Sequence, residues 1–295
     1  MREITYTVRE EDAGASVLSL LRRRLGVSAA LVRRMKRTER GITLDGEHVT
    51  VCALARPWQL LRACWDEEEG SGVVVPTPGE LDIVYEDELL LALNKPAGLP
   101  VHPSRGHYDD TLANRAAWLF RQRGEPFTFH AVNRIDSVTG GLVCIARDKY
   151  AAALLSQAMA DGGVSRTYRA VVCGTGLPET GTVDLPIARC PGRGIMRQVD
   201  PAGQRAVTHY KRLAEGAGHT LLELELETGR THQIRVHFSH LGYPVAGDFM
   251  YGQEREDFPG AALHSYRLRI ALPGREPLEL TVPEPEYFAK LITIG

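Results

Sequence analysis

The first part of the chain shows two short helical periods between strand-like segments. Residues 4–8 alternate weakly and predict a short strand, whereas apolar residues between 15 and 25 recur at helical spacing. A glycine ends this first helix, and Ser28 is a natural N-cap for a second one. The next segment predicts a β-hairpin that turns at Asp45-Gly46, because this dipeptide accepts the positive φ angles of a type I′ turn.

The remainder of the chain alternates hairpin-like and helical patterns. The short apolar run Leu142–Ala146 follows a glycine pair and predicts a buried strand, so the preceding NRIDSVTGG segment is expected to be a loop. Further strands are expected over 81–87, 88–96, 167–172, 206–213, 220–227 and within 263–282, and helices from an Asp110 cap to Arg121 and over 149–159, 230–241 and 286–292. This mixture predicts an α+β fold with a mixed, mostly antiparallel sheet.

A change in composition divides the chain. Residues 66–78 are acidic and then rich in glycine and proline, which is typical of a linker. We therefore expect a small N-terminal α/β module over residues 1–65, a linker over 66–78, and a larger domain over 79–295.

Charge is distributed unevenly, although the formal net charge is only −2. Residues 21–40 hold eight Lys or Arg and one acid, whereas residues 65–90 hold nine Asp or Glu and no base. A local basic surface of this kind can meet phosphates, whose contacts supply most of the affinity for nucleic acids. The candidate side chains on the second helix are Arg33, Arg34, Lys36 and Arg37.

Other bulk properties limit the class of protein. No apolar run reaches the ~18 residues of a membrane span, and the N-terminus is charged, without an apolar signal region. The five cysteines are odd in number and widely spaced, with no C-x-x-C pair. This pattern argues against a disulfide framework or a structural zinc site. We expect a cytoplasmic protein that has no membrane association and is a monomer.

The loop before Leu142 carries the strongest candidate for chemistry. Arg134 and Asp136 lie just before the glycine pair Gly140-Gly141. A carboxylate in such a loop can be held at the edge of a cleft while its oxygens stay reachable. Taken alone, such a pair is more often a turn-capping aspartate, here Asp136, and a solvated arginine, here Arg134.

This loop is not isolated, because NRIDSVTGGL resembles the H-R-L-D-x-x-T-S-G-L signature of the RluA-type RNA pseudouridine synthases. Three further segments resemble the same family in the same order: Asn94–Ser104, Ser165–Gly174 and Glu227–Gly252. Together the segments cover most of residues 80–295. The loop departs from the signature at Asn133, Ile135 and Gly140, but retains its arginine, aspartate and threonine as Arg134, Asp136 and Thr139.

A second resemblance concerns the N-terminal module. Two short basic helices followed by a hairpin resemble the small RNA-binding domain named after ribosomal small-subunit protein four. Many RluA-type enzymes carry this domain before the catalytic domain. The alternative is a solvated basic helix pair without a partner.

The family resemblance implies isomerisation of specific uridines to pseudouridine in structured RNA. This reaction involves no redox change, so neither a metal nor an organic cofactor is expected. The resemblance assigns the catalytic carboxylate to Asp136, its ion-pair partner to Arg235, and a ring that stacks on the target base to Tyr168. Ile234 is expected either to pack on the flipped base or to belong to the core.

A uridine stacked in folded RNA must be extruded before it can react. The guanidinium of Arg134 matches the family's arginine that fills the resulting gap. Weaker candidates for phosphate or loop contacts, each of which could equally be structural, are Lys95, His102, Arg230 and His232.

Two other classes of function remain as alternatives. Four histidines, His232, His237, His240 and His264, invite a metal site, but their spacing is not H-E-x-x-H. The second alternative is a catalytically inactive RNA-binding or ribosome-assembly protein on the same fold. Among targets, ribosomal RNA is favoured and transfer RNA comes next.

Overall fold

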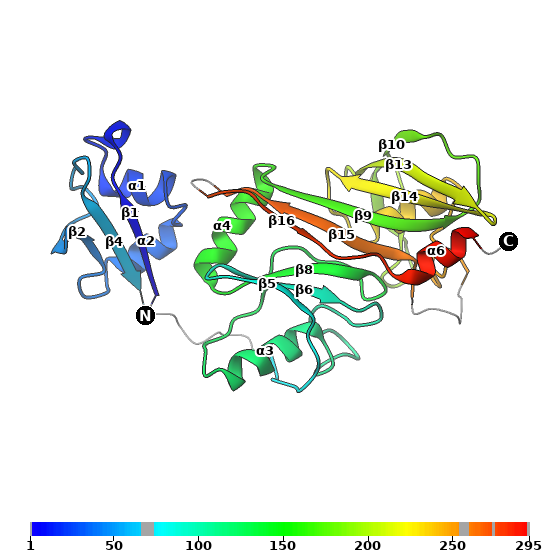
Figure 1. Cartoon of the computed structure of the whole chain (residues 1–295), viewed down its shortest axis with the longest axis horizontal. Coiled ribbons are helices and arrows are strands. Elements are labelled where there is room, and N and C mark those ends of the chain that lie inside the picture. Colours follow the sequence, from blue (N-terminus) through cyan, green and yellow to red (C-terminus); the bar gives the residue numbers. More distant parts are fainter. Residues whose placement is uncertain (1, 66–73, 254–259, 273–274, 294–295) are drawn as a thin grey trace.

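The computed structural model describes residues 2–65, 74–253, 260–272 and 275–293. Most of the expected linker, residues 66–73, therefore lies outside the described residues. Figure 1 shows a small N-terminal unit beside a much longer sheet with helices on it.

The N-terminal unit is a four-stranded sheet with the order β1-β4-β2-β3, covered by two helices. Its elements are β1 (Arg2–Thr7), a short 3-10 turn (Glu10–Asp12), α1 (Val17–Arg23), α2 (Ala29–Met35), β2 (Ile42–Leu44), β3 (Glu47–His48) and β4 (Leu60–Trp65). Ser28 caps α2 by accepting a hydrogen bond from the Leu31 amide at 3.2 Å, as predicted. The hairpin prediction is also confirmed, because Asp45 and Gly46 both have positive φ angles, of 50° and 84°.

The rest of the chain is organised around a ten-stranded sheet. The strands run in the order β10-β13-β14-β9-β15-β8-β6-β5, with β16 paired to β15 and β7 to β8. Their bounds are β5 (Ile83–Glu86), β6 (Leu90–Lys95), β7 (His130–Ala131), β8 (Gly140–Ala146), β9 (Val164–Cys173), β10 (Thr180–Asp184), β13 (Val207–Gly216), β14 (His219–Leu226), β15 (Leu263–Ile270) and β16 (Leu278–Thr281). The pair β15–β8 is parallel, whereas the other described pairs of this sheet are antiparallel. The expected α+β fold with a mixed, mostly antiparallel sheet is confirmed.

Four helices and a separate hairpin complete this part. They are α3 (Leu112–Gln122), α4 (Lys149–Ala160), α5 (Gln233–His240) and α6 (Glu286–Thr293), with the hairpin strands β11 (Ile187–Arg189) and β12 (Arg197–Val199). Two predicted helix starts are wrong. Thr111 rather than Asp110 caps α3, through a capping box with Asn114. The last helix of the signature region begins at Gln233 rather than at residue 230, because His232 has a left-handed φ of 59°.

The second glycine of the pair before β8, Gly141, is required for steric reasons. Its φ is +101°, and a Cβ added there would lie 2.3 Å from the Ser265 carbonyl oxygen of β15. A side chain is therefore excluded by both backbone conformation and space. The strand β8 can approach β15 in parallel only because this position is glycine, and the loop that carries Asp136 enters the sheet here.

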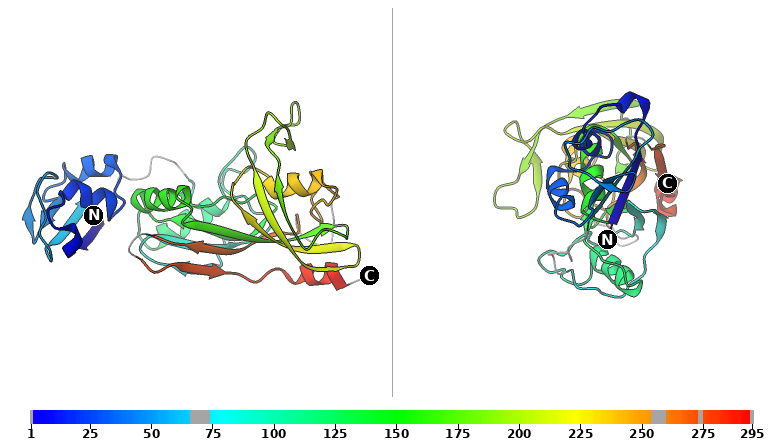
Figure 2. Two further views of the ribbon diagram at one scale, coloured as in Figure 1. Left: turned by 90° about the horizontal axis from the view of Figure 1, so that it is seen from above. Right: turned by 90° about the vertical axis from the view of Figure 1, so that its left-hand side faces the viewer.

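The N-terminal unit packs against α4, which lies between it and most of the long sheet (Figures 1 and 2). The Tyr150 hydroxyl of α4 donates a hydrogen bond to the Leu25 carbonyl at 2.8 Å, and its ring lies 5.5 Å from that of Trp65. The Arg2 guanidinium pairs with Asp148, with 2.7 Å between Nε and Oδ2. The separate sheets support our proposal of a module, linker and larger domain over 1–65, 66–78 and 79–295.

Candidate active site

A cleft of about 790 Å³ lies over the long sheet. Its wall is built from the loop between β7 and β8, from β9, and from the segment that enters α5. Arg134, Asp136, Tyr168 and Arg235 all line this cleft, although they are spread over about a hundred residues. The structure thus brings together the four residues that the family signature singled out.

The carboxylate of Asp136 is paired on one side and reachable on the other. The Arg235 guanidinium donates from Nη1 to Asp136 Oδ2 at 3.1 Å. The Arg235 side chain is only 2% exposed, whereas that of Asp136 is 23% exposed. The cation therefore approaches from beneath the cleft and leaves carboxylate surface facing the solvent. The expected ion pair between these two residues is present.

Arg235 is itself held by a second carboxylate, that of Asp248. Its Nε donates to Asp248 Oδ2 at 2.7 Å and its Nη2 donates to Oδ1 at 2.8 Å. Asp248 is fully buried and also accepts a hydrogen bond from the Met250 amide at 3.0 Å. Burial opposes the charge on the guanidinium, but Asp248 and Asp136 outweigh it and raise the pKa of Arg235. This two-point contact fixes the orientation of the arginine.

Sequence reasoning did not single out Asp248. The residue lies in the GDFMYG end of the long signature segment, so a carboxylate thirteen residues after Arg235 was visible. The pairing itself depends on how the chain turns back after α5. The pattern of apolar residues does not specify that turn.

Tyr168 lies on β9 and forms part of the cleft wall. Burial raises the pKa of its hydroxyl, the nearby charge of Arg166 opposes this shift, and Asp136 adds to it. Ile234 is 4% exposed, belongs to the main core cluster of the larger part, and also lines the cleft. Ile234 is therefore a core residue, and its contact with the flipped base stays a prediction.

The remaining cleft candidates differ in how accessible they are. Arg134 and Arg230 are exposed, and Arg230 donates from Nε to the Arg205 carbonyl at 3.0 Å. His232 is mostly buried, with Nδ1 2.8 Å from the Tyr251 hydroxyl, and burial lowers its pKa. His102 is half-buried, and burial, then the charge of Arg134, lowers its pKa.

Lys95 does not reach the cleft. Its side chain is 1% exposed and its ammonium donates to the carbonyls of Pro96 at 2.8 Å and Ser137 at 3.0 Å. Burial lowers the pKa of Lys95 to about 7, although the charge of Asp136 opposes this shift. Of the two contacts considered for Lys95, the structure shows the loop contact: it ties β6 to the backbone next to Asp136, and a phosphate cannot approach it.

The basic residues of α2 lie away from the cleft, on the N-terminal unit. Arg33, Arg34 and Arg37 line a different cavity, and Lys36 is exposed. Sequence reasoning missed Arg166, two residues before Tyr168 in the signature segment. Arg166 lines the cleft, and its buried Nε has no hydrogen-bond partner among the described residues.

The four histidines considered for a metal site have separate surroundings. His232 contacts Tyr251, and His237 lies 3.0 Å from the Thr208 hydroxyl and 2.9 Å from the Leu185 carbonyl. Burial lowers the pKa of His264 to about 4. Within the described ranges, no group of three or more His, Cys, Asp or Glu side chains is placed to hold a metal ion.

Comparisons with known proteins identify the family of this chain. The model of the RNA pseudouridylate synthase family matches residues 89–240. An uncharacterized RNA pseudouridine synthase of Bacillus subtilis strain 168, YjbO, is 40% identical over 269 residues, covering 91% of this chain and 95% of the relative. The ribosomal large subunit pseudouridine synthase D of Pseudomonas aeruginosa is 39% identical over 246 residues, covering 77% of this chain and 76% of the relative.

A solved structure leads to the same family. The human RNA pseudouridylate synthase domain containing 1 superposes with a TM-score of 0.61 at 29% identity, covering 73% of this chain and 89% of that one. The chain therefore belongs to the RNA pseudouridylate synthase family, and it is an isomerase that acts on RNA. Among the helices that the structure describes, none is long and apolar enough to span a membrane.

Proposed function

We propose that this enzyme isomerises uridines in ribosomal RNA by extruding the target base and acting on it with Asp136. The observation that carries the proposal is the reachable Asp136 carboxylate, whose cation Arg235 is buried and fixed by Asp248. A charge pair held in this way needs little rearrangement when substrate arrives, which is the condition for efficient electrostatic catalysis.

In this proposal each cleft residue has one role in the reaction. Arg134, exposed at the mouth, occupies the gap left by the extruded uridine, while Tyr168 lies against the uracil ring. Asp136 acts as nucleophile or base on the nucleoside. The bond between C1′ and N1 breaks and the bond between C1′ and C5 forms. The C5 proton is lost and N1 gains a proton, so the product is an isomer of the substrate.

The choice of RNA rests on relatives. The ribosomal large subunit pseudouridine synthase D enzymes of Pseudomonas aeruginosa and Xanthomonas campestris are each 39% identical to this chain over more than 220 residues. We therefore favour ribosomal RNA, with transfer RNA as the second candidate. We also propose a cytoplasmic location, which the odd number and wide spacing of the cysteines support, and we take a monomer as the default state.

Tritium release tests the proposal directly. RNA transcribed with 5-tritiated uridine loses its label to water when C5 becomes bonded to the ribose. We expect wild-type protein to release tritium from ribosomal RNA and Asp136→Asn to release none. If folded wild-type protein releases no tritium from ribosomal or transfer RNA, the enzymatic proposal is wrong. An inactive RNA-binding or assembly protein then becomes the better description.

A further inference from the structure

Three cavities follow one another along one side of α4. The first is the catalytic cleft, and the second, of about 240 Å³, shares His102 and Arg134 with it. The third, of about 410 Å³, lies between α2 and the beginning of α4. Thr128 lines the third cavity and the next residue, Phe129, lines the second. One stretch of chain before Asp136 therefore borders all three cavities.

The same continuity is seen on α4 itself. Lys149 lines the third cavity, Ala152 and Ser156 line the second, and Met159 lines the catalytic cleft. Spacings of three and four residues place these side chains on one face of the helix. The twelve residues of α4 extend over ~18 Å at ~1.5 Å per residue. This face, segment 128–136 and the α2 side chains that line the third cavity together form what we call the α4 groove.

The chemistry of the groove changes along its length. At the α2 end, the third cavity is lined by Arg33, Arg34, Arg37 and Lys149 beside the rings of Trp65 and Tyr150. In the middle, the His102 and Phe129 rings meet edge to face at 5.7 Å between centroids. Arg134 stands where the groove opens into the cleft. Among the described residues, no acidic side chain lines the second or third cavity.

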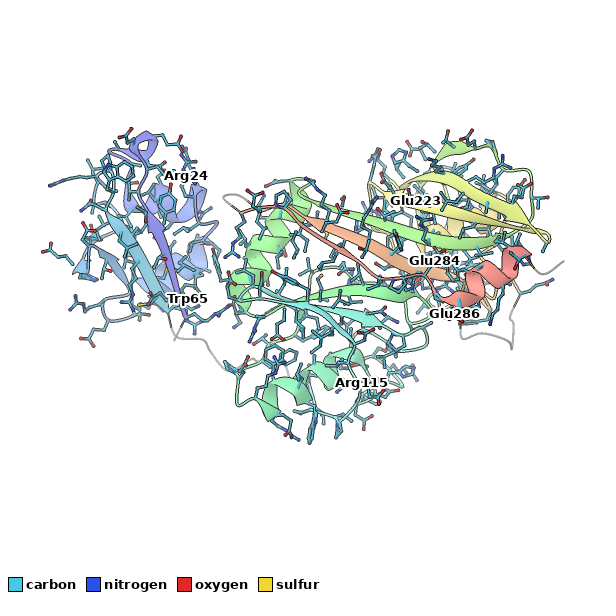
Figure 3. The ribbon with its side chains drawn as sticks, viewed as in Figure 1. Arg24, Trp65, Arg115, Glu223, Glu284 and Glu286 are labelled. Carbon is cyan, nitrogen blue, oxygen red and sulfur yellow. The ribbon has the colours of Figure 1, made fainter. Side chains whose placement is uncertain are left out.

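The α2 end is held in place by contacts between the N-terminal unit and α4. Trp65, labelled in Figure 3 on the edge of the N-terminal unit near α4, packs on Tyr150, whose hydroxyl contacts the Leu25 carbonyl. The apolar cluster at this junction includes Leu21 of α1 and Leu155 of α4, both fully buried. The basic face of α2 is thus a fixed continuation of the cleft in this structure.

We propose that the strand flanking the target uridine runs from Asp136 along the α4 groove to α2, so that both parts of the chain bind one continuous RNA segment. Guanidinium and ammonium groups at the ends match phosphates, and rings between them match bases. At ~3.4 Å per phosphate of a stacked strand, the length of α4 corresponds to about five nucleotides. The proposal rests on the proposed function and adds Lys149, Thr128 and Ser156 to the RNA contacts, while Lys36 lies outside the groove.

Charge reversal in matched pairs tests the α2 end. Arg33→Glu/Arg37→Glu changes the groove, whereas Arg22→Glu/Arg23→Glu makes the same change of charge on exposed residues of α1 that line none of the three cavities. Both pairs are made in the full chain with Asp136→Asn, and binding of a fluorescein-labelled large-subunit ribosomal RNA transcript is measured across salt concentrations. We expect only the first pair to weaken binding by tenfold or more. For this first pair, the slope of log K against the logarithm of the salt concentration should become shallower by about 1 to 2, since each phosphate contact contributes ~0.7.

A second pair tests the middle of the groove. Ser156→Glu places a carboxylate in the groove, whereas Gln157→Glu adds the same charge at the next exposed position, outside it. We expect Ser156→Glu to weaken binding about tenfold and Gln157→Glu to leave it within twofold. Thermal melting confirms that each variant is folded.

The groove proposal is wrong if, in both matched comparisons, the groove variant and its control lose the same affinity for RNA, or if neither groove variant loses affinity. Tritium release by wild-type protein is a separate observation. If tritium is released but binding does not depend on the groove, the proposed function stands and this inference is wrong. If binding depends on the groove but no tritium is released, the groove binds RNA and the proposed function is wrong.

Discussion

The catalytic cleft and the α2 end of the groove use arginine in opposite ways. In the cleft, Arg235 is 2% exposed and three of its nitrogen atoms contact two carboxylates. At α2, Arg33 and Arg37 are exposed on a short helix and the turn after it. A buried, paired arginine acts at one position and with one orientation. An exposed arginine supplies a screened charge that attracts any phosphate within reach.

This difference predicts different kinds of loss. Changes in the cleft should reduce turnover strongly while the RNA still binds. Changes along the groove should reduce affinity with each charge removed, and the loss should be larger at low salt than at high salt. The following variants test that separation, beginning with the largest expected effect.

Asp136→Asn should reduce tritium release by about 10⁴-fold or more, because removing a central catalytic group costs this much in enzymes whose residues act as a unit. Its affinity for the RNA transcript should stay within a few-fold of wild type. A matched change at an exposed carboxylate outside the cleft, Glu225→Gln, serves as control. If Asp136→Asn lost affinity as severely as turnover, the proposed separation between cleft and groove would fail.

Asp248→Asn should reduce kcat by about 10²- to 10³-fold, the scale seen when a preorganised electrostatic contact is lost. KM should change little, because Asp248 is buried behind Arg235 and acts only through it. The protein should also be destabilised by about 3 kcal/mol, since a buried charge loses its partner. Kinetics are therefore measured well below the melting temperature of the variant. An unchanged kcat in folded protein contradicts the positioning role.

Tyr168→Phe keeps the ring and removes the hydroxyl, so it separates stacking from proton transfer. If the hydroxyl transfers a proton, turnover should fall about 10²-fold, and binding should be retained. Tyr210→Phe is the control, because its ring packs edge to face on Phe238 and does not line the cleft. Wild-type turnover in Tyr168→Phe would show that the ring alone is used.

Lys95→Met should alter the pH dependence of stability with little loss of activity. The folded-state pKa of Lys95 is lowered to about 7, so the folded protein binds fewer protons than the unfolded chain between pH 7 and 10. Wild type should therefore gain stability relative to Lys95→Met as pH rises through this window, by about 2–4 kcal/mol. Below pH 7 the gain is lost. Chemical denaturation at pH 6, 8 and 10 measures the free energy of unfolding of both proteins. A difference between wild type and Lys95→Met that does not change with pH would contradict the lowered pKa of the buried amine.

Sequence reasoning succeeded where the signal was local. A short apolar run after a glycine pair located β8, and an amphipathic pattern located α4. The Asp45-Gly46 dipeptide located a hairpin, and the signature segments pointed to the ion pair of Asp136 and Arg235. Periodicity reports which face of an element is buried, but it does not report which distant segments meet. For this reason Asp248 behind Arg235, and the alignment of α4 with α2, required the structure.

Two positions show the same limit at single residues. The sequence left a phosphate contact, a loop contact and a structural role open for Lys95, and the fold selects among them by closing over the side chain so that carbonyls satisfy its ammonium. The helix that carries Arg235 begins later than periodicity suggested, because the left-handed His232 precedes it. Backbone conformation at such a residue depends on tertiary contacts, here the hydrogen bond with Tyr251.

The position of β15 has a consequence for biosynthesis. This strand is formed by residues 263–270, yet it lies between β8, which follows Asp136, and β9, which carries Tyr168. The two sides of the cleft are therefore joined by a strand that is synthesised after both of them. A nascent chain that ends before residue 263 holds Asp136, Tyr168 and Arg235 but lacks the strand between β8 and β9, so activity should arise only after residues 263–270 have been added.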